Sequence, residues 1–364
     1  MRFVSPALKH VVYPAMAGMG WLRRSAPHGV CVVTYHGVLP EGYAQRDPAL
    51  DGNLVSAEML HRQLRLLKSN YQIISPEDFR SWLGGSIKLP VRAVLLTCDD
   101  GLLNLITDML PVLQAEGVKC LFFVTGASAS EIPSELWYER LFLTILRAPA
   151  GKFHVELPEL QIEDELAGAQ QRRAVWWRMV QRLSQKDSDT RAAFLATARR
   201  TWCDSLSADH DASSTPVQRR FWLLTRPQLL QLQDAGMTIG AHTMTHPVLT
   251  QQPLKLAKYE VFQARSVLEK SLGRDVWAFA YPFGDSSSVD SKTIALAREA
   301  RFDAAFLNYG GGFAERFDHF AIPRVHVIST MGLAEFEAHV AGFHNFLQRQ
   351  AGRNLPGSSM AAAS

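Results

Sequence analysis

The sequence has few cysteines and no pattern that pairs them. Its 364 residues include four cysteines, with no CxxC pair and no regular spacing. This excludes a disulfide framework and a zinc site built from cysteines. Three of the four lie in or beside apolar runs, and we interpret them as buried free thiols: Cys31, Cys98 and Cys120. Free thiols favour a reducing compartment, so we expect a cytoplasmic protein, with the inner face of a membrane left open as its location.

Long apolar runs and an excess of basic charge are also lacking. No run approaches the roughly 20 apolar residues of a membrane span, and residues 1–28 contain no convincing signal peptide. We interpret this N-terminal segment as an ordinary helix or arm, with an amphipathic segment that docks peripherally on a membrane as the alternative.

Lys and Arg number 38 against 35 Asp and Glu, a formal charge of +3. A nucleic-acid-binding domain usually concentrates more basic charge, so we expect no nucleic-acid partner.

What the sequence does contain is a repeated order of apolar strand, polar cluster and helix. In the clearest unit, residues 93–98 and 119–124 are apolar runs that flank a helical pattern over 105–115. Strands that are apolar throughout, rather than alternating, are typical of a parallel sheet buried on both faces. The sequence therefore predicts an α/β protein.

A basic, tryptophan-rich segment at 128–220 interrupts this order. We interpret it as an inserted subdomain of amphipathic helices that bury tryptophan and expose arginine; the alternative is a surface for an anionic ligand or a membrane. The expected division of the chain is an N-terminal segment at 1–28, a main domain at 29–127 and 221–348, the helical insertion at 128–220 and a disordered tail at 349–364.

Polar residues follow the predicted strands directly. Asp99 and Asp100 come after one strand, and His242 and His246 come after another. Because the carboxyl ends of parallel strands meet on one side of the fold, we expect these side chains to share one cleft. Two imidazoles and a carboxylate suit Zn²⁺ or a similar ion, and three ligands leave a position open. Adjacent carboxylates at a strand end point in opposite directions, so one can bind an ion while the other accepts a proton from water.

These motifs resemble those of the polysaccharide deacetylase family, also called the NodB-homology family or carbohydrate esterase family 4. The matching segments are TCDDG at 97–101, HTMTH at 242–246, YPFG at 281–284 and YH at 35–36. They are similar to the family's T-F-D-D-G motif, with Cys98 in place of Phe, its H-[ST]-x-x-H motif, its Pro-aromatic motif and an early Y-H element. The likeness covers about residues 30–125 and 222–330.

The resemblance implies a distorted (β/α) barrel of about seven parallel strands, with the segment 128–220 inserted in it. It implies a divalent metal cofactor, with Zn²⁺ expected and Co²⁺ or Ni²⁺ as alternatives. The roles that it implies are metal ligands Asp100, His242 and His246, a catalytic base Asp99, a proton donor His326, and substrate or oxyanion contacts from Tyr281, Pro282 and Phe283. A histidine that merely packs on its strand is the alternative for His326.

One position departs from the family pattern, and one histidine has two possible roles. The family often carries an arginine that tunes the base, and Ala280 stands in its place here. We hypothesise that Arg324, which lies two residues before His326, replaces it. His36 either lines the cleft or makes a structural hydrogen bond.

We therefore expect a metal-dependent hydrolase that removes N-acetyl groups from amino-sugar units of a glycan or a lipid-linked saccharide. The alternatives are a deformylase or deacylase of another small amide, and a catalytically inactive glycan-binding protein, for which the missing arginine at Ala280 is the only support. The sequence fixes neither the sugar, nor the metal, nor the oligomeric state.

Overall fold

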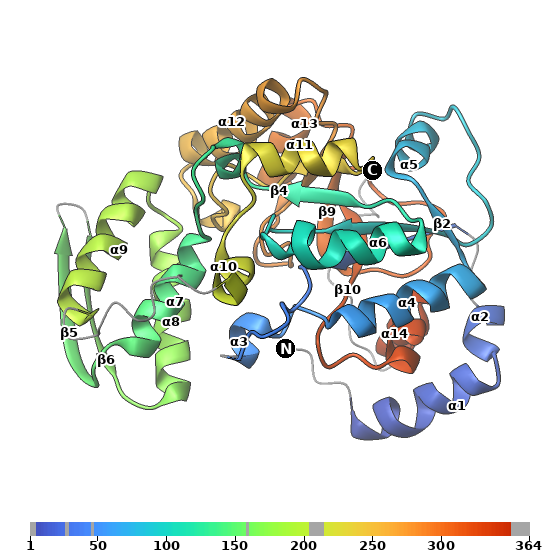
Figure 1. Cartoon of the computed structure of the whole chain (residues 1–364), viewed down its shortest axis with the longest axis horizontal. Coiled ribbons are helices and arrows are strands. Elements are labelled where there is room, and N and C mark those ends of the chain that lie inside the picture. The colour runs from blue at the N-terminus through green and yellow to red at the C-terminus, as the bar shows by residue number, and fades with distance from the viewer. Residues whose placement is uncertain (1–4, 26–28, 45–46, 158–159, 204–214, 351–364) are drawn as a thin grey trace.

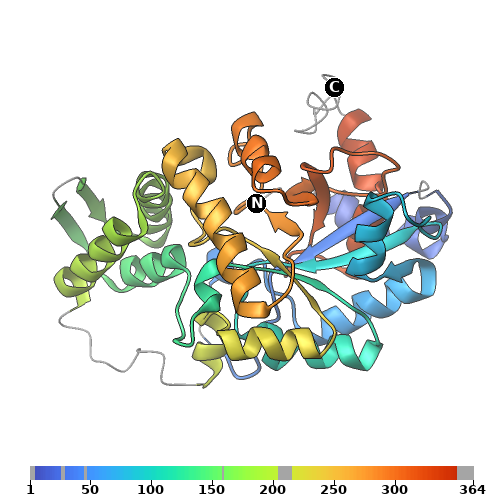
Figure 2. The ribbon, with the colours of Figure 1, turned by 90° about the horizontal axis from the view of Figure 1, so that it is seen from above.

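The centre of the fold is a ring of seven parallel strands (Figures 1 and 2). The structure is a computed structural model that describes residues 5–25, 29–44, 47–157, 160–203 and 215–350. The ring strands are β1 (Val30–Tyr35), β3 (Ala93–Cys98), β4 (Leu121–Val124), β7 (Thr238–Ala241), β8 (Ala278–Ala280), β9 (Ala304–Gly310) and β10 (Ile322–His326). They follow the order β1-β10-β9-β8-β7-β4-β3, and pairing of β1 with β3 closes the ring. The predicted barrel of about seven parallel strands is confirmed.

An eighth strand, β2 (Gln72–Ile74), lies outside the closed ring. It pairs in parallel with the first half of β3, while the second half of β3 pairs with β4. All six residues of β1 and of β3 are buried, which matches their continuous apolar sequence. Burial on both faces is the property that makes such strands read as uninterrupted apolar runs.

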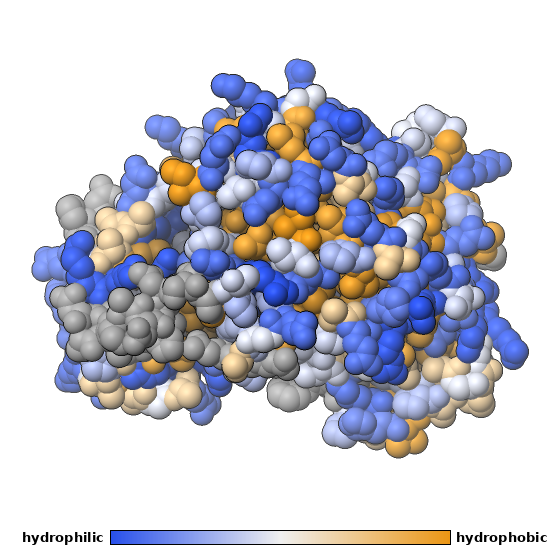
Figure 3. Space-filling view, in the orientation of Figure 1, coloured by the Kyte–Doolittle hydropathy of each residue, from blue (hydrophilic) through white to orange (hydrophobic). Residues whose placement is uncertain are grey.

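Helices surround the ring, and side chains at their ends explain where several of them begin and stop. They are α4 (Ala57–Asn70), α5 (Pro76–Leu83), α6 (Leu110–Glu116), α11 (Arg226–Asp234), α12 (Leu254–Leu272), α13 (Ser291–Glu299) and α14 (Leu333–Val340). Ser56 and Asp290 accept hydrogen bonds from backbone N–H groups in the first turns of α4 and α13. Gly117 and Gly273, both left-handed, end α6 and α12. Figure 3 shows the surface of the molecule from the side seen in Figure 1. Hydrophilic residues cover much of this face, and apolar residues gather near its middle, over the region of α6 and α11.

The segment between β4 and β7 forms a separate lobe, seen at the left of Figure 1. It contains α7 (Trp137–Arg147), β5 (Gly151–Leu157), β6 (Leu160–Leu166), α8 (Ala169–Leu183) and α9 (Ser188–Cys203), and α10 (Thr215–Phe221) leads back to the barrel. The insertion is mostly helical, as expected, but it also contains an antiparallel pair of strands, β5 and β6, that the sequence analysis did not predict. Burial alternates along β6, and its inward side chains join those of the three long helices in a core of their own.

The first described helices lie on the barrel side of the molecule (Figure 1). The N-terminal residues form a π-helix (Leu8–Val12), α1 (Tyr13–Gly18) and α2 (Trp21–Ser25), and α1 packs on α14. The Tyr13 hydroxyl lies 2.7 Å from Nδ1 of His344 in α15 (Phe343–Gln350). The predicted tail at 349–364 falls outside the described residues from 351 onward, and its first two residues belong to α15. Among the described helices none has both the length and the apolar content that crossing a membrane requires.

Candidate metal centre and active site

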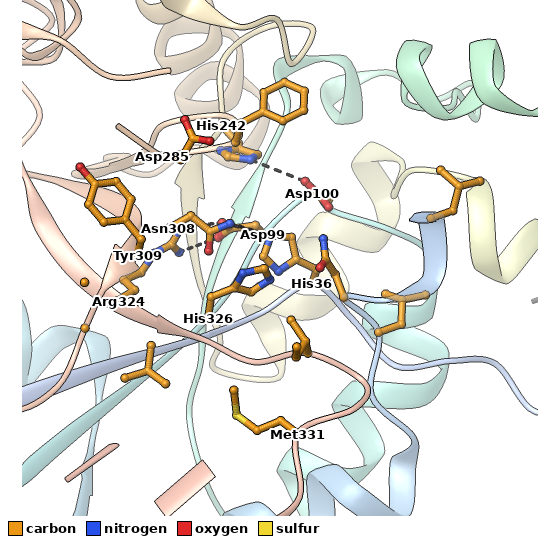
Figure 4. A pocket seen from close by; sticks show the side chains of 18 of the residues that line it. His36, Asp99, Asp100, His242, Asp285, Asn308, Tyr309, Arg324, His326 and Met331 are labelled. Atoms are coloured by element: carbon orange, nitrogen blue, oxygen red, sulfur yellow. Dashed lines mark hydrogen bonds and ion pairs between the residues drawn. The ribbon is translucent and has the colours of Figure 1, made fainter. Parts of the chain in front are cut away.

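The polar clusters that follow the strands meet in one cavity at the carboxyl ends of the barrel strands. Its volume is about 590 Å³. Eight of the ten residues named from the sequence line it: His36, Asp99, Asp100, His242, His246, Phe283, Arg324 and His326. The convergence expected from strand-end placement is therefore present in the structure (Figure 4).

Asp100, His242 and His246 offer three ligand atoms that face one another. Oδ1 of Asp100 lies 3.6 Å from Nε2 of His242 and 3.3 Å from Nε2 of His246. All three side chains are buried, and each offers one ligand atom within 4.8 Å of the other two. Metal–ligand bonds of about 2.0–2.2 Å place neighbouring ligand atoms at separations of this size. The three residues thus form a buried Asp-His-His set that can hold a divalent metal.

The backbone around these ligands adopts a conformation that most residues avoid. Six described residues other than glycine have a positive φ, and four of them lie here: Asp100 (φ 75), Thr243 (φ 63), His246 (φ 58) and Phe283 (φ 61). Gly101 continues the turn with φ +76, and a Cβ there would lie 3.1 Å from Val124. Strained backbone of this kind persists where the surrounding structure fixes side chains for a task. The D-D-G turn therefore needs its glycine to aim Asp100.

The hydrogen bonds of the two histidines show which ring nitrogens remain available to a metal. Nδ1 of His242 lies 2.7 Å from the Ala280 carbonyl oxygen, which fixes Nδ1 as the protonated nitrogen and leaves the lone pair of Nε2 available to a metal. His246 is held through its backbone, because its N–H donates to Thr243 and its carbonyl accepts from the Trp137 indole at 3.1 Å. Nδ1 of His246 has no hydrogen-bond partner among the described residues. The donor set and its geometry fit a divalent ion.

Asp99 points away from this set and is paired with Arg324. The guanidinium donates to both carboxylate oxygens, at 2.7 Å to Oδ1 and 2.5 Å to Oδ2. It also donates to the Leu307 carbonyl and to Thr97. Burial by itself raises the pKa of Asp99, but Arg324 outweighs it and holds the pKa of this carboxyl below its usual value. Asp99 is therefore an ionised carboxylate at neutral pH, in the position that the hypothesis for Arg324 requires.

His326 and His36 lie side by side next to Asp99 (Figure 4). Their ring centroids are 4.8 Å apart, and Nε2 of His36 lies 4.0 Å from Oδ2 of Asp99. Burial lowers the pKa of His326 to about 3, with His36 and Arg324 adding to the effect. Burial also lowers the pKa of His36. Nε2 of His326 has no hydrogen-bond partner among the described residues, so a neutral imidazole is available to a ligand in the cavity.

The Pro-aromatic segment contributes one side chain to the cavity. Phe283 packs on His246, with ring centroids 5.0 Å apart. Tyr281 is buried and its hydroxyl donates to the Phe320 carbonyl at 2.9 Å, so its side chain belongs to the barrel core. Neither Tyr281 nor Pro282 is among the described residues that line the cavity. The structure thus brings Phe283 to the site and leaves the other two side chains outside it.

Several cavity residues were not identified from the sequence. The inserted lobe supplies Tyr138, Glu139, Trp176 and Trp177, and β9 supplies Asn308. Asn308 lies at a strand end, so the rule that located the other motifs could have found it. The sequence analysis noted the lobe for its many arginines and tryptophans. Its cavity residues do not follow barrel strands, so the rule based on strand ends could not identify them.

The Polysaccharide deacetylase family model matches residues 173–305 of this chain. The match contains His242, His246 and Phe283, whereas Asp99 and Asp100 lie outside it. No curated protein matched the chain in the comparison.

Solved structures of deacetylases share the fold. A Streptococcus pyogenes deacetylase, PplD, in complex with acetate superposes with a TM-score of 0.54 at 16% identity, over 86% of this chain and 99% of that one. IcaB from Ammonifex degensii gives 0.53 at 18% identity, over 86% and 98%. A de-N-acetylase from Aggregatibacter actinomycetemcomitans gives 0.50 at 13% identity, over 85% and 99%. At these identities the likeness establishes the fold. The family model matches less than half of the chain and adds a similarity to the Polysaccharide deacetylase family.

Proposed function

We propose that this protein removes N-acetyl groups from the amino-sugar units of a glycan or a lipid-linked saccharide, with Zn²⁺ as its expected cofactor and Co²⁺ or Ni²⁺ as alternatives. The observation that carries the proposal is the paired arrangement of the two adjacent aspartates. Asp100 faces two histidines, and Asp99 faces a buried arginine. One carboxylate is thus available as a ligand and the other as a base, which is the division that hydrolysis by an activated water needs.

Asp100, His242 and His246 would hold the ion. When bound, a divalent ion supplies Lewis acidity, which polarises an amide carbonyl and makes a bound water easier to deprotonate. Asp99 is the proposed proton acceptor. Its oxygens each accept one hydrogen bond from Arg324, and a carboxylate offers about four acceptor positions. Acceptor positions therefore remain for the proton that leaves the attacking water.

His326 is the proposed donor to the departing amine. An amine leaves an amide only if its nitrogen receives a proton as the carbon–nitrogen bond breaks. With a pKa of about 3, His326 is neutral before reaction, so the proton that it delivers to nitrogen has to come from the attacking water by way of Asp99. The unpartnered Nε2 supports this role.

Arg324 is the proposed replacement for the arginine missing at Ala280. It reaches the base from β10, and its aromatic neighbours Phe123 and Phe306 lie 5.4 and 6.0 Å from the guanidinium carbon. Its contact with the carboxylate is bidentate, so it fixes the orientation of Asp99 and also stabilises its negative charge. The absence of the usual motif arginine is therefore weak support for an inactive glycan-binding protein.

Deformylation, or deacylation of another small amide, is the second candidate. The polar residues described here act on the amide group itself, and none of them identifies the acyl chain or the acceptor. For the acceptor, the aromatic side chains that line the cavity favour a sugar.

We also propose a cytoplasmic location and a peripheral contact with a membrane, from the cysteines and from the class of substrate. Three free cysteines are buried, which supports a reducing, cytoplasmic environment. A peripheral contact with the inner face of a membrane is compatible with a lipid-linked substrate.

Product analysis tests the function. N-acetylglucosamine oligomers, lipid-linked saccharides and formylated amines are incubated side by side with wild type and Asp99→Asn, and released acetate or formate is quantified. We expect acetate from the amino sugars, a requirement for divalent metal, and at least a hundredfold lower kcat in Asp99→Asn, the lower end of the usual effect of a general base. Metal content should be equal in the two proteins. Full activity in Asp99→Asn would contradict the assignment of the base, and formate as the main product would favour the second candidate.

A further inference from the structure

The wall of the cavity beyond the metal centre is aromatic and comes from the inserted lobe. Trp177 in α8 is 39% exposed. Of the large apolar side chains that the structure describes as exposed, it is the one that also lines the cavity. A tryptophan that is partly exposed inside a concave site leaves part of its ring open to a ligand.

Aromatic rings lead from the metal centre outward to this tryptophan. Tyr138 lies 5.0 Å from His246 and 5.5 Å from Phe283 between ring centroids. Phe283 lies 5.8 Å from Trp177, and Trp176 lies 5.8 Å from Trp177 on its other side. The rings therefore form a continuous path from a proposed metal ligand to the exposed tryptophan.

Buried polar contacts hold the lobe in place on the barrel. Within the lobe, the Trp176 indole of α8 donates to the Tyr138 carbonyl of α7 at 2.8 Å, which ties the two helices that carry the aromatic wall to each other. Arg191 of α9 is buried and donates to Thr245, within the histidine motif, and to Glu260 of α12 at 3.4 Å. Contacts between buried charged groups resist displacement, because separating them leaves a charge without a partner. The aromatic wall is therefore a positioned part of the site.

We propose that Trp177, with Phe283 and Tyr138, forms a carbohydrate subsite that binds a second sugar ring, next to the ring that carries the amide to be cut. A pyranose ring has a face of C–H groups, which packs on the electron-rich face of an aromatic ring. Its hydroxyls lie at the edge, where Asp285 and Ser286 line the same cavity. This inference rests on the proposed function and assigns the lobe a role in selecting oligomers over single sugars.

The test compares kcat/KM for a pentamer of N-acetylglucosamine and for the monomer. The variants are Trp177→Ala, Trp177→Phe and a matched control, Trp21→Ala, whose tryptophan is 40% exposed but lies outside the cavity lining. We expect wild type to prefer the pentamer. Trp177→Ala should lower kcat/KM for the pentamer about tenfold, mainly through KM, and leave the monomer unchanged. Trp177→Phe should retain most of the preference, and Trp21→Ala all of it.

The outcomes separate the subsite from the reaction. If Trp177→Ala keeps the preference of wild type, or lowers the two substrates equally, the subsite is wrong while the proposed function stands. If wild type releases acetate from neither substrate but does so from lipid-linked saccharides, the oligomer subsite is wrong while the proposed function stands; if it releases acetate from none of them, both fail.

Discussion

At the scale of single residues, the pair formed by Asp99 and Arg324 combines charge, burial and orientation. Both side chains are almost fully buried, and the two hydrogen bonds between them are short. Removing one member of a buried pair leaves the other charge unpaired, which costs about 3–5 kcal/mol, whereas replacing both together is often neutral.

Arg324→Met should therefore lower the free energy of unfolding by about 3–5 kcal/mol, because Asp99 would remain buried without a cation. The double variant Asp99→Asn/Arg324→Met should recover most of this loss, since the methionine can pack beside Phe123 and Phe306, but it should stay inactive. Denaturant unfolding and acetate release measure the two effects. Additive losses in the double variant would show that the two residues are not coupled.

His326 can be tested through the leaving group. His326→Gln should lower kcat on an N-acetyl amino sugar by roughly a hundredfold or more, because the amine then lacks a proton donor. The same variant should lose much less activity on 4-nitrophenyl acetate, whose phenolate leaves without a proton. Steady-state kinetics on the two substrates give the comparison. Equal losses on both would contradict a donor role and favour a histidine that only shapes the cavity.

At the scale of elements, a buried network joins the lobe to the barrel. Arg220 of α10 donates to Glu139 of α7 at 2.9 Å and to Asp51 of α3 (Pro48–Asp51) at 2.6 Å. Burial raises the pKa of Glu139 from 4.5 to about 7, against the lowering effect of Arg220. Folded Glu139 therefore holds a proton that the unfolded chain releases at lower pH. Its contribution to folding stability falls as the pH rises from about 4.5 to about 7 and is constant above that.

Glu139→Gln should remove this fall, because glutamine does not titrate. As the pH rises from 5 to 8, the free energy of unfolding of the variant should therefore increase relative to that of wild type. Denaturant unfolding at the two pH values measures this difference. Glu163→Gln, at an exposed position of β6, is the control and should keep the pH dependence of wild type. An unchanged pH dependence in Glu139→Gln would show that Glu139 is ionised across this range.

Local sequence patterns predicted the elements of the barrel well and those of the lobe less well. Continuous apolar runs marked β1 and β3 because both strands are buried on both faces. The β5–β6 pair was missed although its residues alternate between apolar and polar, the period of a half-buried strand, because the helical patterns on either side dominated the interpretation.

At the scale of the whole molecule, the parts of the site differ in how far the sequence could predict them. Residues at strand ends were found because parallel topology brings those ends together. Arg324 could be linked to His326 because residues two apart on a strand share a face. Trp177 could not be placed, since its position depends on how the lobe sits on the barrel. Contacts between distant segments, such as Arg191 with Glu260, fix that arrangement, and no local pattern encodes them.

Asp100, His242 and His246 should together bind one ion. Metal content per chain, measured by mass spectrometry on purified wild type and on His242→Ala and His246→Ala, tests it most directly. Trp21→Ala serves as a variant that should keep the metal. We expect about one divalent ion per chain in wild type and a large loss in both histidine variants. Equal metal content in wild type and the histidine variants, with all proteins folded, would show that these residues do not bind the ion.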